Sequence, residues 1–100
     1  MARVFPEHET RIGSVADRHG ELGLATEDVC AIYRTMVTAR AVDQKLWNLS
    51  RTRKIPFMIP GQGQEAAQVG SAMTLRRGHD MVLPYYRDVG VVLALSLIHI

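Results

Sequence analysis

The feature that most constrains the fold is a long stretch in which apolar residues recur at intervals of three or four. Such spacing places apolar side chains on one face of an α-helix. Thr26 is a suitable N-cap residue, and Glu27 and Asp28 bring negative charge to the first turn, where the helix dipole favours it. The pattern predicts one long helix over residues 27–52. Its apolar stripe consists of Ile32, Met36, Ala39, Val42, Leu46 and Leu49.

Shorter elements are predicted on either side of this helix. Residues 1–25 show no sustained period and are predicted to form an N-terminal arm. The two prolines of "KIPFMIP" predict an extended connector, after which a helix is expected from Gln64 to Leu75. "MVL" predicts a short buried strand, and "VGVVLAL" predicts the start of a further helix. The expected fold class is therefore α/β, mostly helical with one or two short strands.

Composition and charge exclude several classes of function. Of the 100 residues, 47% are hydrophobic and 22% charged, which is an ordinary balance for a globular protein. The 12 basic and 10 acidic residues are spread along the chain, so no nucleic-acid partner is expected. No run of apolar residues reaches the roughly 20 that a membrane helix needs, and the N-terminus lacks the apolar core of a signal peptide. We expect a cytoplasmic protein, in which the single cysteine, Cys30, is a buried and inert thiol.

The segment "GQGQEAAQVG" raises the question of a dinucleotide site. Gly61, Gly63 and Ala66 fit the pattern G-x-G-x-x-[G/A], which in dinucleotide-binding proteins follows a buried strand and opens a helix. Here the preceding segment carries two prolines, and the acidic residue Asp80 precedes the predicted strand instead of following it. A tight turn into a closely packed helix is therefore favoured over a pyrophosphate-binding loop.

A second polar motif, "LPYYRD", follows the predicted strand. Arg87 can form paired hydrogen bonds to phosphate oxygens, and the phenol of Tyr86 can donate one more. The start of the next helix offers free backbone amides. This combination suits a phosphorylated cofactor. A purely structural Arg87, paired with Asp88 or another carboxylate, is the alternative, and the chemistry of the residues leaves both open.

Residues 33–95 resemble a known enzyme family. The motifs "R-x-x-D-x-x-L" in the long helix, "GQG-x-EA" and "YRD-x-G" occur in the order and spacing of the alpha subunit of the thiamine diphosphate-dependent first component of 2-oxo acid dehydrogenase complexes. The branched-chain type is the more similar, and the pyruvate type is a near relative. The resemblance implies decarboxylation of a 2-oxo acid and transfer of the acyl group to a lipoyl arm. It also implies a beta subunit and a lipoyl-bearing acyltransferase as partners.

The resemblance implies roles for three residues. Tyr86 and Arg87 match the pair that contacts the diphosphate of thiamine diphosphate, although Tyr85 stands where the branched-chain type often has glutamine. Phe57 matches a position on the substrate side of the pocket. Glu65 is assigned no catalytic role, because the glutamate that activates the cofactor in this family belongs to the beta subunit. No catalytic residue is therefore assigned.

The resemblance also implies magnesium at the diphosphate, but the family's metal-binding "GDG...N" segment does not occur here. No metal ligand is assigned, since the histidines lie far apart without a cluster of cysteines or carboxylates. These histidines are His8, His19, His79 and His99.

The length of the chain and its last residues predict a fragment. Family alpha subunits are several times longer, so we expect residues 26–95 to form a partial thiamine diphosphate-binding dehydrogenase domain that neither completes the site nor folds stably alone. The final "LSLIHI" matches the translation of a transposon-end adapter of sequencing libraries, and residues 96–100 are predicted to be a non-native tail, with a native apolar helix as the alternative. The alternative function is a helical protein-interaction module without catalysis.

Overall fold

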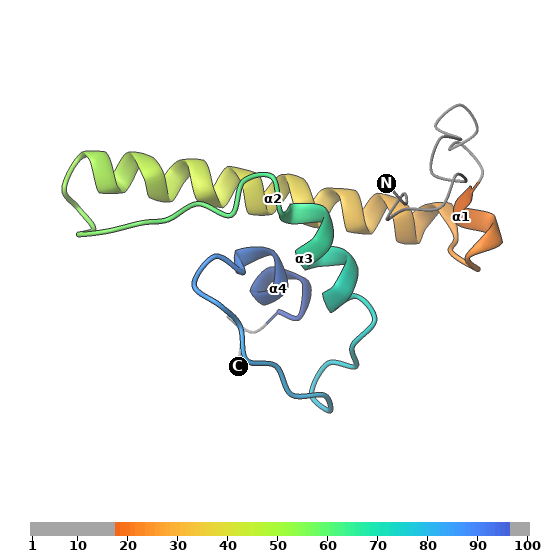
Figure 1. Cartoon of the computed structure of the whole chain (residues 1–100). Helices are drawn as coiled ribbons and strands as arrows, with labels where there is room; N and C mark the ends of the chain where they lie inside the picture. Colours follow the sequence, from red (N-terminus) through yellow and green to blue (C-terminus); the bar gives the residue numbers. More distant parts are fainter. Residues whose placement is uncertain (1–17, 97–100) are drawn as a thin grey trace, which may run out of the picture.

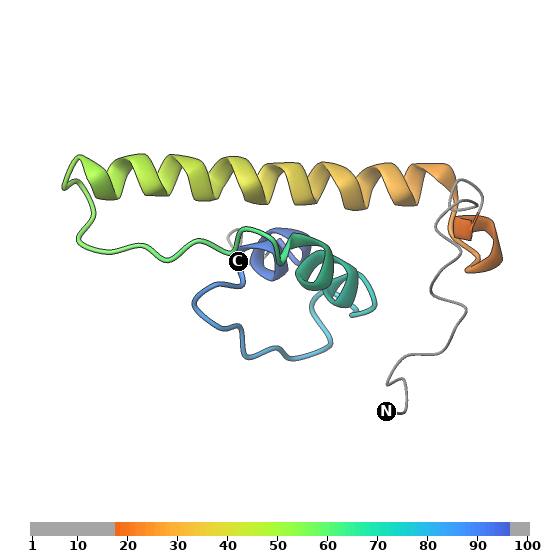
Figure 2. The same cartoon turned by 45° about the horizontal axis from the view of Figure 1, so that its top comes forward.

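A computed structural model describes residues 18–96, which form four helices in the order α1 (Arg18–Glu21), α2 (Thr26–Arg51), α3 (Glu65–Ala72) and α4 (Val89–Ala94). Helix α2 extends along one side of the molecule, and α3 and α4 both pack beneath its middle (Figures 1 and 2). Most of residues 1–25 and of the predicted tail, together with His8 and His99, lie outside the described residues.

The long helix α2 has 26 residues and matches the predicted helix to within one residue at each end. Its N-cap is Ala25, not Thr26, because the carboxylate of Asp28 accepts a hydrogen bond from the Ala25 backbone N–H at 2.9 Å. At the other end Arg53 takes a positive φ of 58°. The N–H groups of Arg53 and Lys54 then bond back to the carbonyls of Ser50 and Leu49, which satisfies the last turn.

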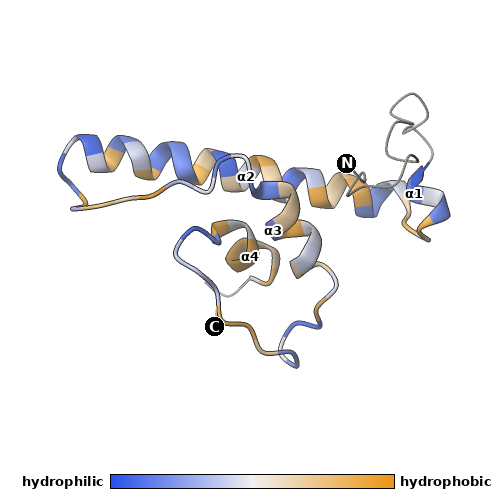
Figure 3. Cartoon of the chain, in the orientation of Figure 1, coloured by the Kyte–Doolittle hydropathy of each residue, from blue (hydrophilic) through white to orange (hydrophobic). Residues whose placement is uncertain are grey.

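The core is small and lies where α2, α3 and α4 meet. Buried residues of α3 and α4 contact one apolar strip of α2, and Figure 3 shows that α4 is apolar along most of its length while α2 alternates. The buried members are Val69, Ala72, Ala94 and Leu95, with Ile32, Met36, Leu75, Val82 and Val91 packed around them. Small residues at the contacts let the three helices approach closely.

The expectation of a mostly helical chain is confirmed, but the α/β class and the short strands are not. Residues 81–83 form a loop, in which the side chains of Met81 and Leu83 are 95% and 99% exposed and only Val82 packs on the core. No other strand lies within residues 18–96 to satisfy the backbone of such a segment. A strand is stable only when its N–H and C=O groups have partners. The predicted buried strand is therefore not confirmed in residues 18–96.

Two further expectations need correction. Helix α3 ends at Ala72 and not at Leu75, because the chain then tightens into a turn in which the N–H groups of Thr74 and Leu75 bond three residues back. Cys30 is exposed, not buried. It lies on a face of α2 that neither α3 nor α4 covers, beside Val29, Tyr33 and Val37. None of the helices in residues 18–96 is both long enough and apolar enough to cross a membrane.

Candidate functional site

A hollow of about 370 Å³ brings together two of the residues singled out in the sequence, Phe57 and Tyr86. Its walls come from three segments: the second half of α2, the connector that runs back alongside α2, and the loop before α4 (Figure 1). The lining is apolar except for Asp43 and the phenol of Tyr86. The lining residues are Asp43, Leu46, Ile55, Phe57, Met58, Ile59, Tyr86 and Val89.

The loop before α4 presents a phenol and a guanidinium side by side. The hydroxyl of Tyr85 donates to that of Tyr86 at 2.6 Å, and the guanidinium carbon of Arg87 lies 5.8 Å from the centre of the Tyr86 ring. The hydrogen bond from Tyr85, aided by the positive charge of Arg87, lowers the pKa of Tyr86. The loop thus concentrates hydrogen-bond donors beside the hollow.

Arg87 is not held by a carboxylate within the described residues. The carboxylate of Asp88 instead accepts the backbone N–H of Tyr85 at 2.8 Å, and the ion pairs of residues 18–96 join other side chains. The Nε atom of Arg87 is buried and has no hydrogen-bond partner in the described part of the chain. A buried donor without a partner is costly, so the described residues do not support the structural alternative, in which a carboxylate pairs with Arg87.

The glycine segment does not offer its amides to a ligand. The N–H of Gly61 donates to the carboxylate of Asp43 at 2.9 Å, and that of Gly63 donates to the carboxylate of Glu65 at 2.9 Å. Gly63 has a positive φ of 89°, and the connector before it is not a strand. The segment is a tight turn into α3, as the sequence predicted, and the dinucleotide interpretation has no support.

Sequence reasoning missed two buried polar residues beneath the loop. Asp43 is only 2% exposed and holds the turn at Gly61, while Gln68 is 6% exposed and bonds to the backbone at Arg87 and at Gly90. A polar residue on the apolar stripe of α2, between Ala39 and Leu46, could have identified Asp43. Gln68 has no comparable signal, because nothing in a short helix rich in alanine and glycine shows which glutamine turns inward.

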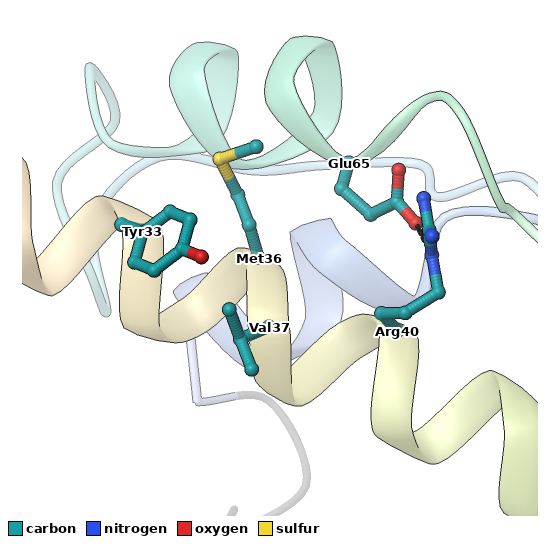
Figure 4. Close-up of a pocket in the computed structure, with 5 residues that line it drawn as sticks. All are labelled: Tyr33, Met36, Val37, Arg40 and Glu65. Atoms are coloured by element: carbon teal, nitrogen blue, oxygen red, sulfur yellow. Dashed lines mark hydrogen bonds and ion pairs between the residues drawn. The ribbon is translucent and has the colours of Figure 1, made fainter.

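Glu65 is engaged in an ion pair with Arg40 that joins α3 to α2 (Figure 4). The pair closes one end of a second, smaller hollow of about 200 Å³ lined by Tyr33, Met36 and Val37. The hydrogen bond from Arg40 holds the pKa of Glu65 below its usual value of 4.5, despite the burial of the carboxylate. Its contacts give Glu65 a role in joining two helices.

This pair predicts an acid-sensitive contribution to stability. A carboxyl group whose pKa is lowered by folding stabilises the folded state above its unfolded pKa, and this contribution disappears as the pH falls through the folded pKa. We expect Glu65→Gln to lower the melting temperature at neutral pH and to match the wild type well below pH 4.5. Glu27→Gln, on the exposed start of α2, is the matched control. Parallel wild-type and Glu65→Gln stability curves over this range would contradict the assignment.

Metal ligands are not found together in the described part of the chain. No group of three or more histidine, cysteine, aspartate or glutamate residues lies close enough in residues 18–96 to hold an ion. His19 is in α1 and His79 in the turn after α3.

The fold and the hollow together define a helical segment that carries a tyrosine-arginine loop beside an apolar pocket. Comparison with known proteins shows to which family such a chain belongs. Residues 33–99 match the family described as "Dehydrogenase E1 component", and the chain belongs to that family. No solved structure matches the chain significantly.

Curated relatives include both branched-chain and pyruvate types. The chain is 56% identical to the 2-oxoisovalerate dehydrogenase subunit alpha of Bacillus subtilis over 81% of its own length and 24% of that relative. It is 40% identical to the 3-methyl-2-oxobutanoate dehydrogenase subunit alpha of Mycobacterium tuberculosis over 78% of its length and 21% of the relative. It is 35% identical to the pyruvate dehydrogenase E1 component subunit alpha of Bacillus subtilis over 77% of its length and 20% of the relative. The chain thus spans less than a quarter of the length of these relatives.

Proposed function

We propose that this chain is part of the alpha subunit of a 2-oxo acid dehydrogenase that decarboxylates a branched-chain 2-oxo acid. The observation that carries the proposal is the neighbouring placement of Tyr86, which lines an apolar hollow, and the half-buried Arg87, whose Nε atom has no hydrogen-bond partner among the described residues. The names of the relatives support the reaction class, and the higher identity to a branched-chain subunit than to a pyruvate subunit supports the substrate class.

Arg87 and Tyr86 would hold the diphosphate of thiamine diphosphate. A guanidinium and a phenol are donors that diphosphate oxygens accept well, and neither side chain has a competing carboxylate among the described residues. The bound cofactor supplies an electron sink that accepts the electron pair released when carbon dioxide leaves. In this proposal Arg87 and Tyr86 bind and orient the cofactor.

Phe57 would line the substrate side of the pocket. Its ring is 71% exposed and faces the same hollow as Tyr86, with Met58 and Ile59 beside it. Apolar contacts of this kind suit a branched aliphatic side chain and discriminate it by the area that it buries.

The proposal includes further components that the described residues do not themselves supply. They are magnesium, a beta subunit, a lipoyl-bearing acyltransferase and the strands of an α/β domain. The exposed apolar residues Tyr33, Val37 and Leu83 support such partners, since large apolar surfaces usually mark contacts. An interaction module without catalysis would also expose such residues, but it gives no reason for the tyrosine-arginine loop. A cytoplasmic location stays a prediction.

The proposal is tested in the full-length subunit that carries these residues, co-expressed with its beta subunit. Oxidation of 3-methyl-2-oxobutanoate and of pyruvate is followed with an artificial electron acceptor, with and without thiamine diphosphate and magnesium. We expect cofactor-dependent activity with a preference for the branched substrate. Phe57→Ala should raise the KM for that substrate and leave the Kd for the cofactor unchanged. Activity that does not depend on thiamine diphosphate, or none with either acid, would refute the proposal.

A further inference from the structure

The buried side chain of Gln68 joins α3 to both ends of the turn that leads from Arg87 into α4. Its Nε2 atom donates to the backbone carbonyl of Arg87 at 2.7 Å, and its Oε1 atom accepts the backbone N–H of Gly90 at 3.2 Å. The carboxamide therefore binds both ends of the four-residue segment 87–90, one end through its donor and the other through its acceptor. The turn that precedes this segment is closed by its own bonds between Tyr85 and Asp88.

Two glycines leave room for this carboxamide and for the Arg87 peptide. A Cβ atom on Gly90 would lie 2.7 Å from the Oε1 atom of Gln68, and one on Gly61 would lie 2.5 Å from the carbonyl oxygen of Arg87. A flipped carboxamide would set its oxygen against the Arg87 carbonyl, where two acceptors repel. The surroundings thus fix both the place and the orientation of the Gln68 side chain.

We propose that Gln68 is a positioning residue for cofactor binding: by clamping the Arg87 carbonyl and the Gly90 amide, it aims the Arg87 guanidinium and the Tyr86 hydroxyl at the diphosphate. This inference rests on the function proposed above. A loop that already has its binding conformation loses less entropy when the ligand arrives, so the clamp raises affinity without touching the ligand.

The test measures the Kd for thiamine diphosphate by calorimetry in the full-length subunit assembled with its beta subunit. Gln68→Glu retains the shape and the acceptor toward Gly90, but its ionised carboxylate cannot donate to the Arg87 carbonyl. Because that partly buried carbonyl then lacks its partner, we expect a Kd roughly tenfold higher than in the wild type. The KM for the 2-oxo acid at saturating cofactor should not change. Gln62→Glu, which places the same charge on an exposed residue of the preceding turn, should bind like the wild type.

A second variant separates positioning from general stability. Val69→Ala removes a fully buried side chain next to Gln68 and should lower the melting temperature while retaining the wild-type Kd. The proposal is overturned if Gln68→Glu binds the cofactor as the wild type does, or if Val69→Ala weakens binding to the same degree. A wild-type complex that does not bind thiamine diphosphate would refute the proposed function itself. Normal binding by the wild type and Gln68→Glu, with weak binding by Arg87→Met, would refute only the role of Gln68.

Discussion

Replacing Arg87 with methionine is expected to raise the Kd for thiamine diphosphate by roughly ten- to a hundredfold. Methionine retains much of the length of the side chain but cannot donate to phosphate oxygens. Hydrogen bonds to a charged group contribute about 1.5 to 3 kcal/mol, which corresponds to this loss of affinity. Within residues 18–96 the Nε atom of Arg87 has no hydrogen-bond partner, so the substitution removes no hydrogen bond from that atom there. Calorimetric titration of the assembled full-length subunit with the cofactor gives the Kd directly.

The matched control for this variant is Arg76→Met. Arg76 lies in the turn after α3, where its exposed side chain pairs with Asp80 and does not line the hollow. The Arg76→Met substitution also removes one positive charge from the chain, so a general electrostatic effect would appear equally in both variants. Equal affinities in Arg87→Met and in the wild type would show that the diphosphate is anchored elsewhere.

Gly61→Ala is expected to disrupt the site through packing alone. The new methyl group would lie 2.5 Å from the carbonyl oxygen of Arg87 and 3.2 Å from the Nε2 atom of Gln68. The nearest of these atoms belongs to the backbone, so the turn and the loop must move apart. Overpacking of this kind costs about 1 to 3 kcal/mol. We expect a lower melting temperature together with a loss of cofactor binding, measured by thermal unfolding and by titration.

Gly70→Ala in α3 is the control for this substitution. A Cβ atom at Gly70 would meet nothing within 4 Å, and alanine is favoured over glycine in a helix by about 0.5 to 1 kcal/mol. This variant should therefore melt at or above the wild-type temperature and bind the cofactor normally. If both alanine variants behaved alike, the close approach of Gly61 to Arg87 would not matter for the site.

The elements that the sequence predicted well are those with a local cause. Helix α2 followed from a long apolar stripe and from acidic residues in its first turn, and the turn at Gly61 followed from the absence of a preceding strand. The prediction of a strand at 81–83 was not confirmed, because a strand depends on partners that are often distant in sequence. The prediction that Cys30 is buried was wrong for a related reason. Periodicity shows that a helix face is apolar, but it does not show which part of that face another element covers.

The sequence singles out residues of the candidate site one by one, but it does not predict how they are arranged. The chemistry of Tyr86 and Arg87 suggested a phosphate site, and the resemblance added Phe57. That Phe57 and Tyr86 line one hollow depends on how the connector returns along α2, which no local pattern encodes. The inward orientation of Gln68 likewise depends on the packing of α3 against the loop.

The most direct test of the account is a crystal structure of the assembled full-length subunit with thiamine diphosphate and magnesium bound. The account predicts that the guanidinium of Arg87 and the hydroxyl of Tyr86 donate to the diphosphate. It also predicts that Gln68 still bonds to the Arg87 carbonyl beneath them. A diphosphate held by other residues, with Arg87 turned toward a protein carboxylate, would contradict it.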